Sequence, residues 1–209
     1  FLSKLARRLP DRRGALDIGT GDGAFLERLL EHGFTDVVGV EPSAAPVALA
    51  APAVKASIRQ GPFRASEFES ARFALVSCFQ TMEHVDDPLG LCKDAHRLLK
   101  DRGAVFLVCH DFRALSARIM GLKSPIFDIE HLQLFSPASI RRTLERAGFG
   151  GVEVHTVVNR YPLHYWAKLA PLPTSMKGRF LQKLKGSRLG KVLLAAPVGN
   201  IAAIAYKTR

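Results

Sequence analysis

A short stretch near the start of the chain combines an acid with closely spaced glycines, residue types from which many nucleotide sites are built. Asp17 stands two residues before Gly19, and Gly21 and Gly23 follow at alternate positions. Glycine readily adopts a positive φ and lets a ligand lie against the backbone, here beside Thr20. A carboxylate at position 17 suits an ammonium group better than a pyrophosphate, which it would repel. The stretch therefore predicts a binding turn for a nucleotide-like ligand that carries an amino group.

The spacing of these glycines separates two classes of nucleotide-binding protein. The dinucleotide fingerprint is GxGxxG, whereas this chain reads GxGxG and has Ala24 where the third glycine would fall. A second acid, Glu41, ends the apolar run 36–40 and is placed to accept hydrogen bonds from both hydroxyls of a ribose. An amino group at Asp17 and a ribose at Glu41 together describe a nucleoside joined to an amino acid. This combination disfavours a nicotinamide-dependent oxidoreductase.

Several acids and histidines could act as a general base in a transfer reaction. They follow predicted strands or lie in a lid-like stretch, residues 112–135, and are Glu83, His84, His110, Asp111 and His131. The catalytic prediction rests on Glu83, His84 and His131. Each also has a structural interpretation, since Glu83 and His84 could cap the helix that follows and His131 could fasten the lid. A base qualifies only within hydrogen-bonding reach of the substrate.

These residues require a fold that brings the ends of several strands together. Apolar runs bounded by turn residues predict strands at 15–18, 36–40, 54–59, 73–79, 104–109, 152–158 and 201–207. Helical patterns fall at 2–9, 22–32, 44–51, 86–100, 136–147 and 176–185. Strands that alternate with helices indicate an α/β fold with a mostly parallel sheet and helices on both faces. Ligands bind such sheets at the carboxyl ends of the strands, where Asp17, Glu41 and Glu83 fall.

Several segments resemble the motifs of the class I S-adenosylmethionine-dependent methyltransferases, small-molecule branch. In the family's order they are LDIGTGDG at 16–23, the acid Glu41, FALVSCFQTMEHVDDP at 73–88, LLKDRGA at 98–104, HLQLFS at 131–136 and AGF at 147–149. The resemblance covers almost the whole chain and implies a Rossmann-like, seven-stranded, mostly parallel sheet with an antiparallel last strand. It implies methyl transfer from S-adenosylmethionine to a small-molecule or lipid-linked acceptor. The chain departs from the family at Ala74, where an acid commonly opens the fourth strand.

The resemblance places the cofactor at the strand ends. The implied contacts are Asp17, Gly19, Thr20, Gly21, Gly23, Glu41, Pro42, Phe63 and Gln80. Phe63 is expected to contact the adenine ring, and Gln80 to lie beside the methionine end. The reaction is an in-line displacement at an activated methyl group, so that the protein must mainly hold the reactants in line. No metal site is expected.

The positive charge of the chain is concentrated near its end. The 209 residues include 30 Lys and Arg against 19 Asp and Glu, a net charge of +11, and residues 160–209 hold ten basic residues and no acidic one. We therefore expect a single methyltransferase domain, 1–209, with a basic helical insertion at about 160–200 that contains a Pro-rich turn at 171–173. The amphipathic part, 176–185, suits an anionic membrane surface or a phosphorylated or nucleotide-linked substrate, or it covers the sheet.

Cysteine use and hydropathy bear on the expected compartment. Cys78, Cys92 and Cys109 show no CxxC spacing, so we expect neither a disulfide framework nor a zinc site and infer a reduced, cytoplasmic environment. The apolar stretch 192–205 is shorter than the ~20 residues of a membrane span and is interrupted by Pro197. Peripheral membrane contact through 160–200 stays open as a second location.

Two further functions are carried as alternatives to a small-molecule enzyme. One is a non-catalytic protein that binds S-adenosylmethionine. The other is a nucleic-acid or protein methyltransferase, which is disfavoured because the fourth strand is followed by FQTM at 79–82 rather than by an NPPY-like motif. Nucleic acid is accordingly disfavoured as a partner.

Overall fold

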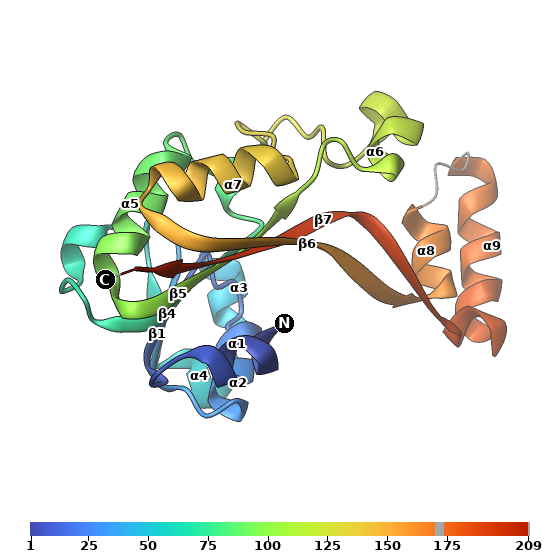
Figure 1. Ribbon diagram of the computed structural model, residues 1–209. Coiled ribbons are helices and arrows are strands. Elements are labelled where there is room, and N and C mark those ends of the chain that lie inside the picture. Colours follow the sequence, from blue (N-terminus) through green and yellow to red (C-terminus); the bar gives the residue numbers. More distant parts are fainter. Residues whose placement is uncertain (170–173, 209) are drawn as a thin grey trace.

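The computed structural model describes residues 1–169 and 174–208, which form an α/β fold around one sheet (Figure 1). The strands are β1 (Arg13–Ile18), β2 (Thr35–Glu41), β3 (Ile58–Gln60), β4 (Phe73–Phe79), β5 (Leu99–His110), β6 (Phe149–Pro162) and β7 (Leu193–Lys207). Their order in the seven-stranded sheet is β3-β2-β1-β4-β5-β7-β6. The pairs from β3 to β5 are parallel, and β7 runs antiparallel to both of its neighbours, β5 and β6. The predicted Rossmann-like sheet with an antiparallel last strand is confirmed.

Helices cover both faces of the sheet, as predicted. The helices of the structure are α1 (Leu2–Arg8), α2 (Ala24–Glu31), α3 (Ala44–Ala48), α4 (Pro52–Lys55), α5 (Pro88–Leu98), α6 (Leu115–Met120), α7 (Pro137–Arg146), α8 (Leu163–Leu169) and α9 (Thr174–Gly186). Helices α1, α2 and α4 share one apolar core with the sheet, and α5 and α7 share the other. Neighbouring strand residues alternate between the two, so that Ala15 belongs to the first core and Leu16 to the second. The free, buried thiols are Cys78, Cys92 and Cys109.

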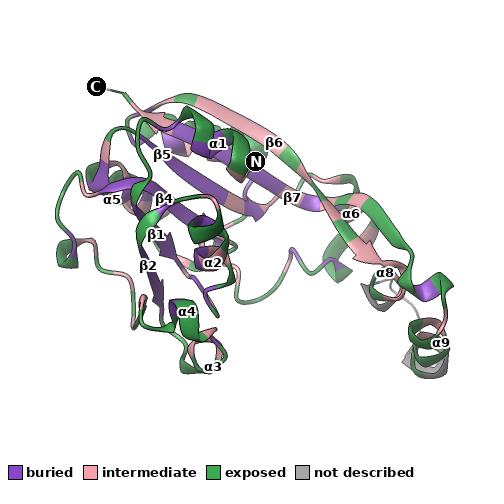
Figure 2. Cartoon of the chain, turned by 90° about the horizontal axis from the view of Figure 1, so that it is seen from below, coloured by how far each residue is buried: buried purple, intermediate pink, exposed green. Residues whose placement is uncertain are grey.

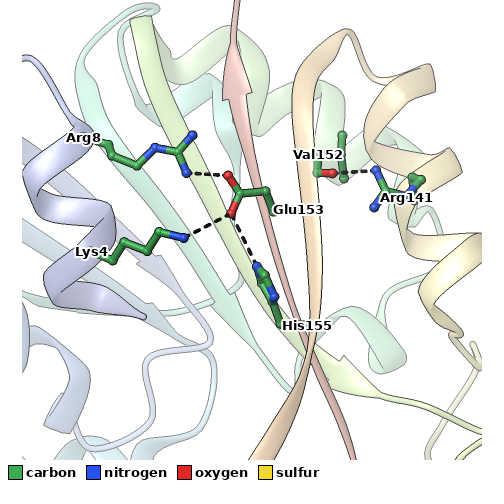
Figure 3. A network of polar contacts seen from close by, with 6 residues as sticks. All are labelled: Lys4, Arg8, Arg141, Val152, Glu153 and His155. Atoms are coloured by element: carbon green, nitrogen blue, oxygen red, sulfur yellow. Dashed lines mark hydrogen bonds and ion pairs between the residues drawn. The ribbon is translucent and has the colours of Figure 1, made fainter.

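Glu153 on β6 joins α1 to the sheet (Figure 3). Its carboxylate accepts a hydrogen bond from Arg8 and lies 4.0 Å from Lys4 Nζ and 3.4 Å from His155 Nε2. The hydrogen bond from Arg8 lowers the pKa of Glu153. Because these side chains are 30% to 68% exposed, the ion pairs add little stability and mainly orient α1. From α7, on the other face, Arg141 donates a hydrogen bond to a backbone oxygen of β6.

Several predicted boundaries are wrong, and at two of them the type of element also differs. The predicted strand 54–59 starts in a helix, because Val54 belongs to α4 and is fully buried in the core that α2 shares; only β3 pairs with β2. Proline suits the first turn of a helix, and Pro52 begins α4. The predicted helix 86–100 ends earlier, since β5 already begins at Leu99.

The most extended part of the structure is the arm, which we define as residues 160–200. Figure 1 shows β6 and β7 continuing beyond the rest of the sheet as a two-stranded ribbon, with α8 and α9 at its far end. In this ribbon, residues 158–162 pair with residues 193–197. Figure 2 shows the strands buried within the sheet and mostly intermediate or exposed along the arm. The predicted insertion is therefore helical at its tip and strand at its two ends.

Parts of the predicted insertion lie outside the described residues. The predicted features concerned include the turn 171–173 and the side chains of Met176, Lys177 and Phe180. Among the helices that the structure describes, none is long and apolar enough to cross a membrane.

Candidate active site

The glycine turn between β1 and α2 forms the centre of the candidate site. Gly19, Gly21 and Gly23 have φ values of 75°, 60° and 79°, which residues other than glycine rarely adopt. The N–H groups of Gly19 and Thr20 donate to the backbone oxygen of β2 residue 40 at 2.9 and 3.1 Å. A Cβ added at Gly19 would lie 2.1 Å from Thr81 Oγ1, whereas one at Gly21 would meet no atom within 4 Å. The turn is therefore tightly packed where it leaves β1 and open at its middle.

Glu41, at the end of β2, points its carboxylate at this turn. Its Oε2 accepts a hydrogen bond from the Gly21 N–H at 2.9 Å, and its Oε1 accepts one from the Ser43 N–H at 2.8 Å. The residue is buried, with 8% of its surface exposed. Each carboxylate oxygen retains a further lone pair, so two ligand hydroxyls can still be accepted. The geometry fits the predicted ribose contact.

Asp17 lies beneath the turn, in the interior of the sheet. It is 2% exposed, and its Oδ1 accepts a hydrogen bond from Ser77 Oγ on β4 at 2.6 Å. Burial raises the pKa of Asp17 to about 6, and the hydrogen bond from Ser77 opposes this rise. Asp17 is therefore mostly ionised at neutral pH, and a cation bound close by would further stabilise its ionised form.

The raised pKa of Asp17 predicts a pH dependence of stability. Since the folded chain holds this proton more tightly than the unfolded chain, the contribution of Asp17 to the free energy of unfolding is complete below pH 4 and is lost as the pH rises through 6. The expected loss is about 3 kcal/mol, because the pKa of Asp17 is about 6 in the folded chain against an ordinary value of 3.8. Urea unfolding between pH 4 and 7 should show that the free energy of unfolding of the wild type falls relative to that of Asp17→Asn. The exposed Asp101→Asn is the matched control, and an Asp17→Asn profile parallel to wild type would contradict the assignment.

Thr20 adds a second sign that the turn receives a ligand. Its hydroxyl is buried and makes no hydrogen bond of good geometry within the described part of the chain, although it lies close enough to Asp17 to lower the pKa of that carboxyl. Buried hydroxyls nearly always have a partner, so an unsatisfied one requires an explanation. Together with the open side of Gly21 and the anchored carboxylate of Glu41, it fits a ligand with hydroxyl and amino groups bound over the turn.

Three other predicted contacts lie around this turn at different depths. Pro42 is exposed beside Glu41. Phe63 is half-buried and stacks on Phe68 with ring centroids 6.2 Å apart, so one side of its ring is already covered. Gln80 directly follows β4 with a φ of 49°, and its N–H donates to a backbone oxygen of β5 at 2.7 Å. Their contacts with a cofactor stay predictions.

The predicted bases occupy different environments. Glu83 is fully buried; its Oε1 accepts the backbone N–H of His110 at 2.6 Å, and its Oε2 has no partner among the described residues. The rings of His84, His131 and His110 form a row with centroid spacings of 4.9 and 5.3 Å. His84 Nδ1 lies 2.9 Å from the backbone oxygen of Glu130, and His131 Nδ1 lies 2.8 Å from another lid carbonyl. These contacts support the structural interpretation of His84 and His131, which hold the lid.

A cavity of about 370 Å³ lies at the carboxyl ends of β4 and β5, between the lid and the arm. The sheet ends, the lid and the arm each contribute to its wall, through Gln80 and His110, Met120 and Ile126, and Tyr161 and Trp166, respectively. Its volume is within the ~300–1,000 Å³ of ordinary ligand pockets. The arm residues were missed in the sequence because only the pairing of β6 with β7 brings them to this edge of the sheet.

Comparisons with known proteins agree with this architecture. Residues 1–154 match the family model described as "Methyltransferase domain". A ubiquinone biosynthesis O-methyltransferase of Pseudomonas aeruginosa is 35% identical over 98 residues, which cover 44% of this chain and 42% of that protein. A protein of the same name from Coxiella burnetii is 25% identical over 166 residues, or 71% of this chain and 70% of that protein. The chain thus matches less than half the length of the P. aeruginosa relative.

A solved structure shows the same fold. The S-adenosylmethionine-dependent methyltransferase of Archaeoglobus fulgidus superposes with a TM-score of 0.64, at 22% identity, over 98% of this chain and 92% of that one. The resemblance that the motifs indicated is thereby confirmed. The chain belongs to the methyltransferase-domain family and has the class I fold of the S-adenosylmethionine-dependent methyltransferases.

Proposed function

We propose that this chain transfers a methyl group from S-adenosylmethionine to a hydroxyl of a small acceptor with an apolar tail. The observation that carries the proposal is the Glu41 carboxylate, which the N–H groups of Gly21 and Ser43 hold beside the open side of the glycine turn. A carboxylate so held is poised for a ribose, and the turn leaves room for the rest of a nucleoside.

The residues of the turn divide the cofactor contacts among them. When bound, S-adenosylmethionine supplies a methyl group already activated by the positive charge on sulfur. Glu41 accepts the ribose hydroxyls, Asp17 provides negative charge for the amino group, and the Thr20 hydroxyl finds its missing partner in the ligand. Because the methyl group is activated, the main task of the chain is to hold the acceptor in line with it.

The names of the relatives support oxygen as the atom methylated. The proteins of P. aeruginosa and C. burnetii are both named O-methyltransferases of ubiquinone biosynthesis. A hydroxyl acceptor must lose its proton as the oxygen attacks, so a base near the acceptor accelerates the reaction by about 10²–10⁴-fold.

The surface around the cavity supports an acceptor drawn from a membrane. The exposed large apolar side chains of the described residues gather in residues 112–194, and only Phe1, Leu30 and Leu49 lie elsewhere. In the lid, Ile129 is 97% exposed, and in the arm Leu189 is 62% exposed. Exposed apolar groups of this density mark interaction surfaces rather than ordinary solvated ones.

The charge of the arm indicates which kind of surface it meets. Exposed Lys183, Lys185, Arg188 and Lys191 lie beside these apolar side chains, and residues 160–209 contain no acid to offset them. Basic and apolar side chains together favour the interface of an anionic membrane. We therefore propose that the arm and lid rest on such a membrane, with the chain at its cytoplasmic side.

Sedimentation with vesicles tests the membrane contact. Vesicles of phosphatidylglycerol and phosphatidylcholine should bind the chain more tightly than phosphatidylcholine alone. Reversing Lys183 and Lys185 to Glu should weaken binding to the anionic vesicles at least about tenfold, since each basic residue near the surface contributes ~1 kcal/mol. The double reversal of Lys55 and Lys93, both exposed and outside the arm, makes the same change in net charge. Equal losses in the two double variants would contradict a docking role for the arm.

The cofactor and the catalytic activity need separate measurements. Calorimetry should show binding of S-adenosylmethionine and none of NAD. Transfer of labelled methyl from S-adenosylmethionine to hydroxylated lipids would establish the enzyme. Binding of the cofactor with no transfer would favour the non-catalytic alternative.

A further inference from the structure

The cavity between the lid and the arm adjoins the cofactor turn through the loop that follows β4. Gln80 lines the cavity. The next residue, Thr81, packs against the glycine turn so closely that a Cβ at Gly19 would overlap its side chain. One short loop thus has the cavity on one side and the turn on the other. A group held in the cavity therefore lies next to whatever the turn binds.

The chemistry of the cavity wall selects an uncharged ligand. None of the described residues that line it is Asp, Glu, Lys or Arg, and Tyr161, Tyr165 and Trp166 supply aromatic faces. Two polar atoms in this wall, Ser116 Oγ and Asn159 Oδ1, are buried and lack a hydrogen-bond partner in the described structure. Buried polar atoms without partners indicate that a ligand or water satisfies them. A planar, neutral ring with hydroxyl groups meets both requirements.

His110 is the basic group of this wall. Its Nδ1 lies 2.8 Å from Asn200 Oδ1, on the strand that pairs with β5. An amide oxygen only accepts, so Nδ1 donates to it, and in the neutral imidazole Nε2 therefore carries the lone pair. The backbone N–H of His110 is fixed by the Glu83 carboxylate at 2.6 Å. Glu83 thus holds the backbone of His110, and Asn200 holds its ring in the tautomer in which Nε2 accepts a proton.

We propose that this cavity is the acceptor site and that His110 Nε2 removes the proton of the acceptor hydroxyl. The proposal rests on the function proposed above. The acceptor oxygen forms a bond to the methyl carbon as the bond between that carbon and the cofactor sulfur breaks. The electron pair of the broken bond stays on sulfur. The hydroxyl proton passes to His110 Nε2 and then to solvent. Glu83 and Asn200 are positioning residues in this scheme, and the neighbouring titratable ring is His131.

Binding in the cavity can be measured without turnover. Trp166, the single tryptophan of the chain, lines the cavity, so its fluorescence reports occupancy. The probe is 4-nonylcatechol, titrated in the presence of S-adenosylhomocysteine, and saturable quenching is expected. Ser116→Leu, which fills the cavity from the lid, should weaken the quenching at least about tenfold while calorimetry shows unchanged S-adenosylmethionine binding. If this variant does not fold, Val198→Phe makes the same change from β7.

The role of His110 is tested with two acceptors of different acidity. His110→Gln should lower kcat for 4-nonylcatechol by about 10²–10⁴-fold with little change in its quenching constant. For 4-nitrocatechol, whose hydroxyl is far more acidic, the same variant should lose less than about tenfold in kcat, because its weakly held proton needs less help from a base. Saturating concentrations offset the weaker binding of its ionised form to the uncharged wall. His32→Gln, at the end of α2, is the matched control for loss of an imidazole.

Each result has a contrary outcome. Equal losses for the two catechols would show that His110 is only structural. The acceptor site would be overturned if neither Ser116→Leu nor Val198→Phe changed the quenching. It would also be overturned if the wild-type chain bound S-adenosylmethionine but neither bound nor methylated a catechol. Failure of S-adenosylmethionine itself to bind would instead overturn the proposed function.

Discussion

Replacing Gly19 by alanine is expected to lower the affinity for S-adenosylmethionine about 100-fold or more. The new Cβ would lie 2.1 Å from Thr81 Oγ1 at a φ of 75°, so both the side chain and the backbone resist it. Strain at such a φ costs about 1–3 kcal/mol, and overpacking adds about the same. The free turn shifts to relieve this cost, and binding of the cofactor has to reverse the shift, so about 3 kcal/mol of it corresponds to that change in Kd. Calorimetry measures the affinity, and urea unfolding measures the loss of stability.

Two further variants separate the clash from the backbone strain. Gly33 has a similar φ of 80° but lies just after α2, where a Cβ would meet only the end of the Arg12 side chain. Gly33→Ala should therefore lose about 1 kcal/mol of stability and keep its affinity for the cofactor. Thr81→Ala, added to Gly19→Ala, should restore part of the affinity, because it removes the overlapping hydroxyl. Wild-type affinity in Gly19→Ala would show that the turn is not the cofactor site.

Glu41→Ala is the second substitution with a large expected effect, again about 100-fold in the Kd for S-adenosylmethionine. Hydrogen bonds to a charged group contribute about 1.5–3 kcal/mol each, and this carboxylate is placed for two ribose hydroxyls. The change also leaves the N–H groups of Gly21 and Ser43 without their acceptor. Glutamine is no neutral replacement here, because its NH₂ group would face one of these two donors.

A cofactor analogue separates the two roles of Glu41, which are to bind the ribose and to hold the glycine turn. The 2′-deoxy form of S-adenosylhomocysteine should bind wild type more weakly than S-adenosylhomocysteine does. In Glu41→Ala the two ligands should bind alike, since the partner of the missing hydroxyl is gone. A coupling energy near zero in this double-mutant cycle would place the ribose elsewhere.

Local patterns predicted the central strands and the residues at their ends. The runs that became β1, β2 and β4 are short and apolar, and each is followed by turn residues that a strand end requires. The pattern of apolar residues gave the wrong element at Val54, because a buried, β-branched residue fits the sequence pattern of a strand and that of a short helix equally well. It also failed along the ribbon of β6 and β7, where intermediate and exposed residues pair only with a distant segment.

The same reason limits what the sequence shows of the acceptor side of the site. His110 could be selected as one of several bases, since it follows a predicted strand. Its partner Asn200 is 90 residues away and reaches it only through the pairing of β5 with β7. The placement of Glu83 in the interior rather than on the cavity wall likewise depends on the lid, whose Gln133 donates to the Glu83 backbone oxygen.

The strand order β5-β7-β6 has a consequence for how the chain is made. On a ribosome, β6 emerges well before β7, yet β7 lies between it and the remainder of the sheet. Until residues 193–207 have been synthesised, one edge of β5 is unpaired and β6 has no partner strand at all, and unpaired strands are sites of wrong pairing and aggregation. The nascent chain therefore completes its sheet late, when β7 pairs with β5 along one edge and with β6 along the other. The arm lengthens this interval, because its helices must be translated before the closing strand.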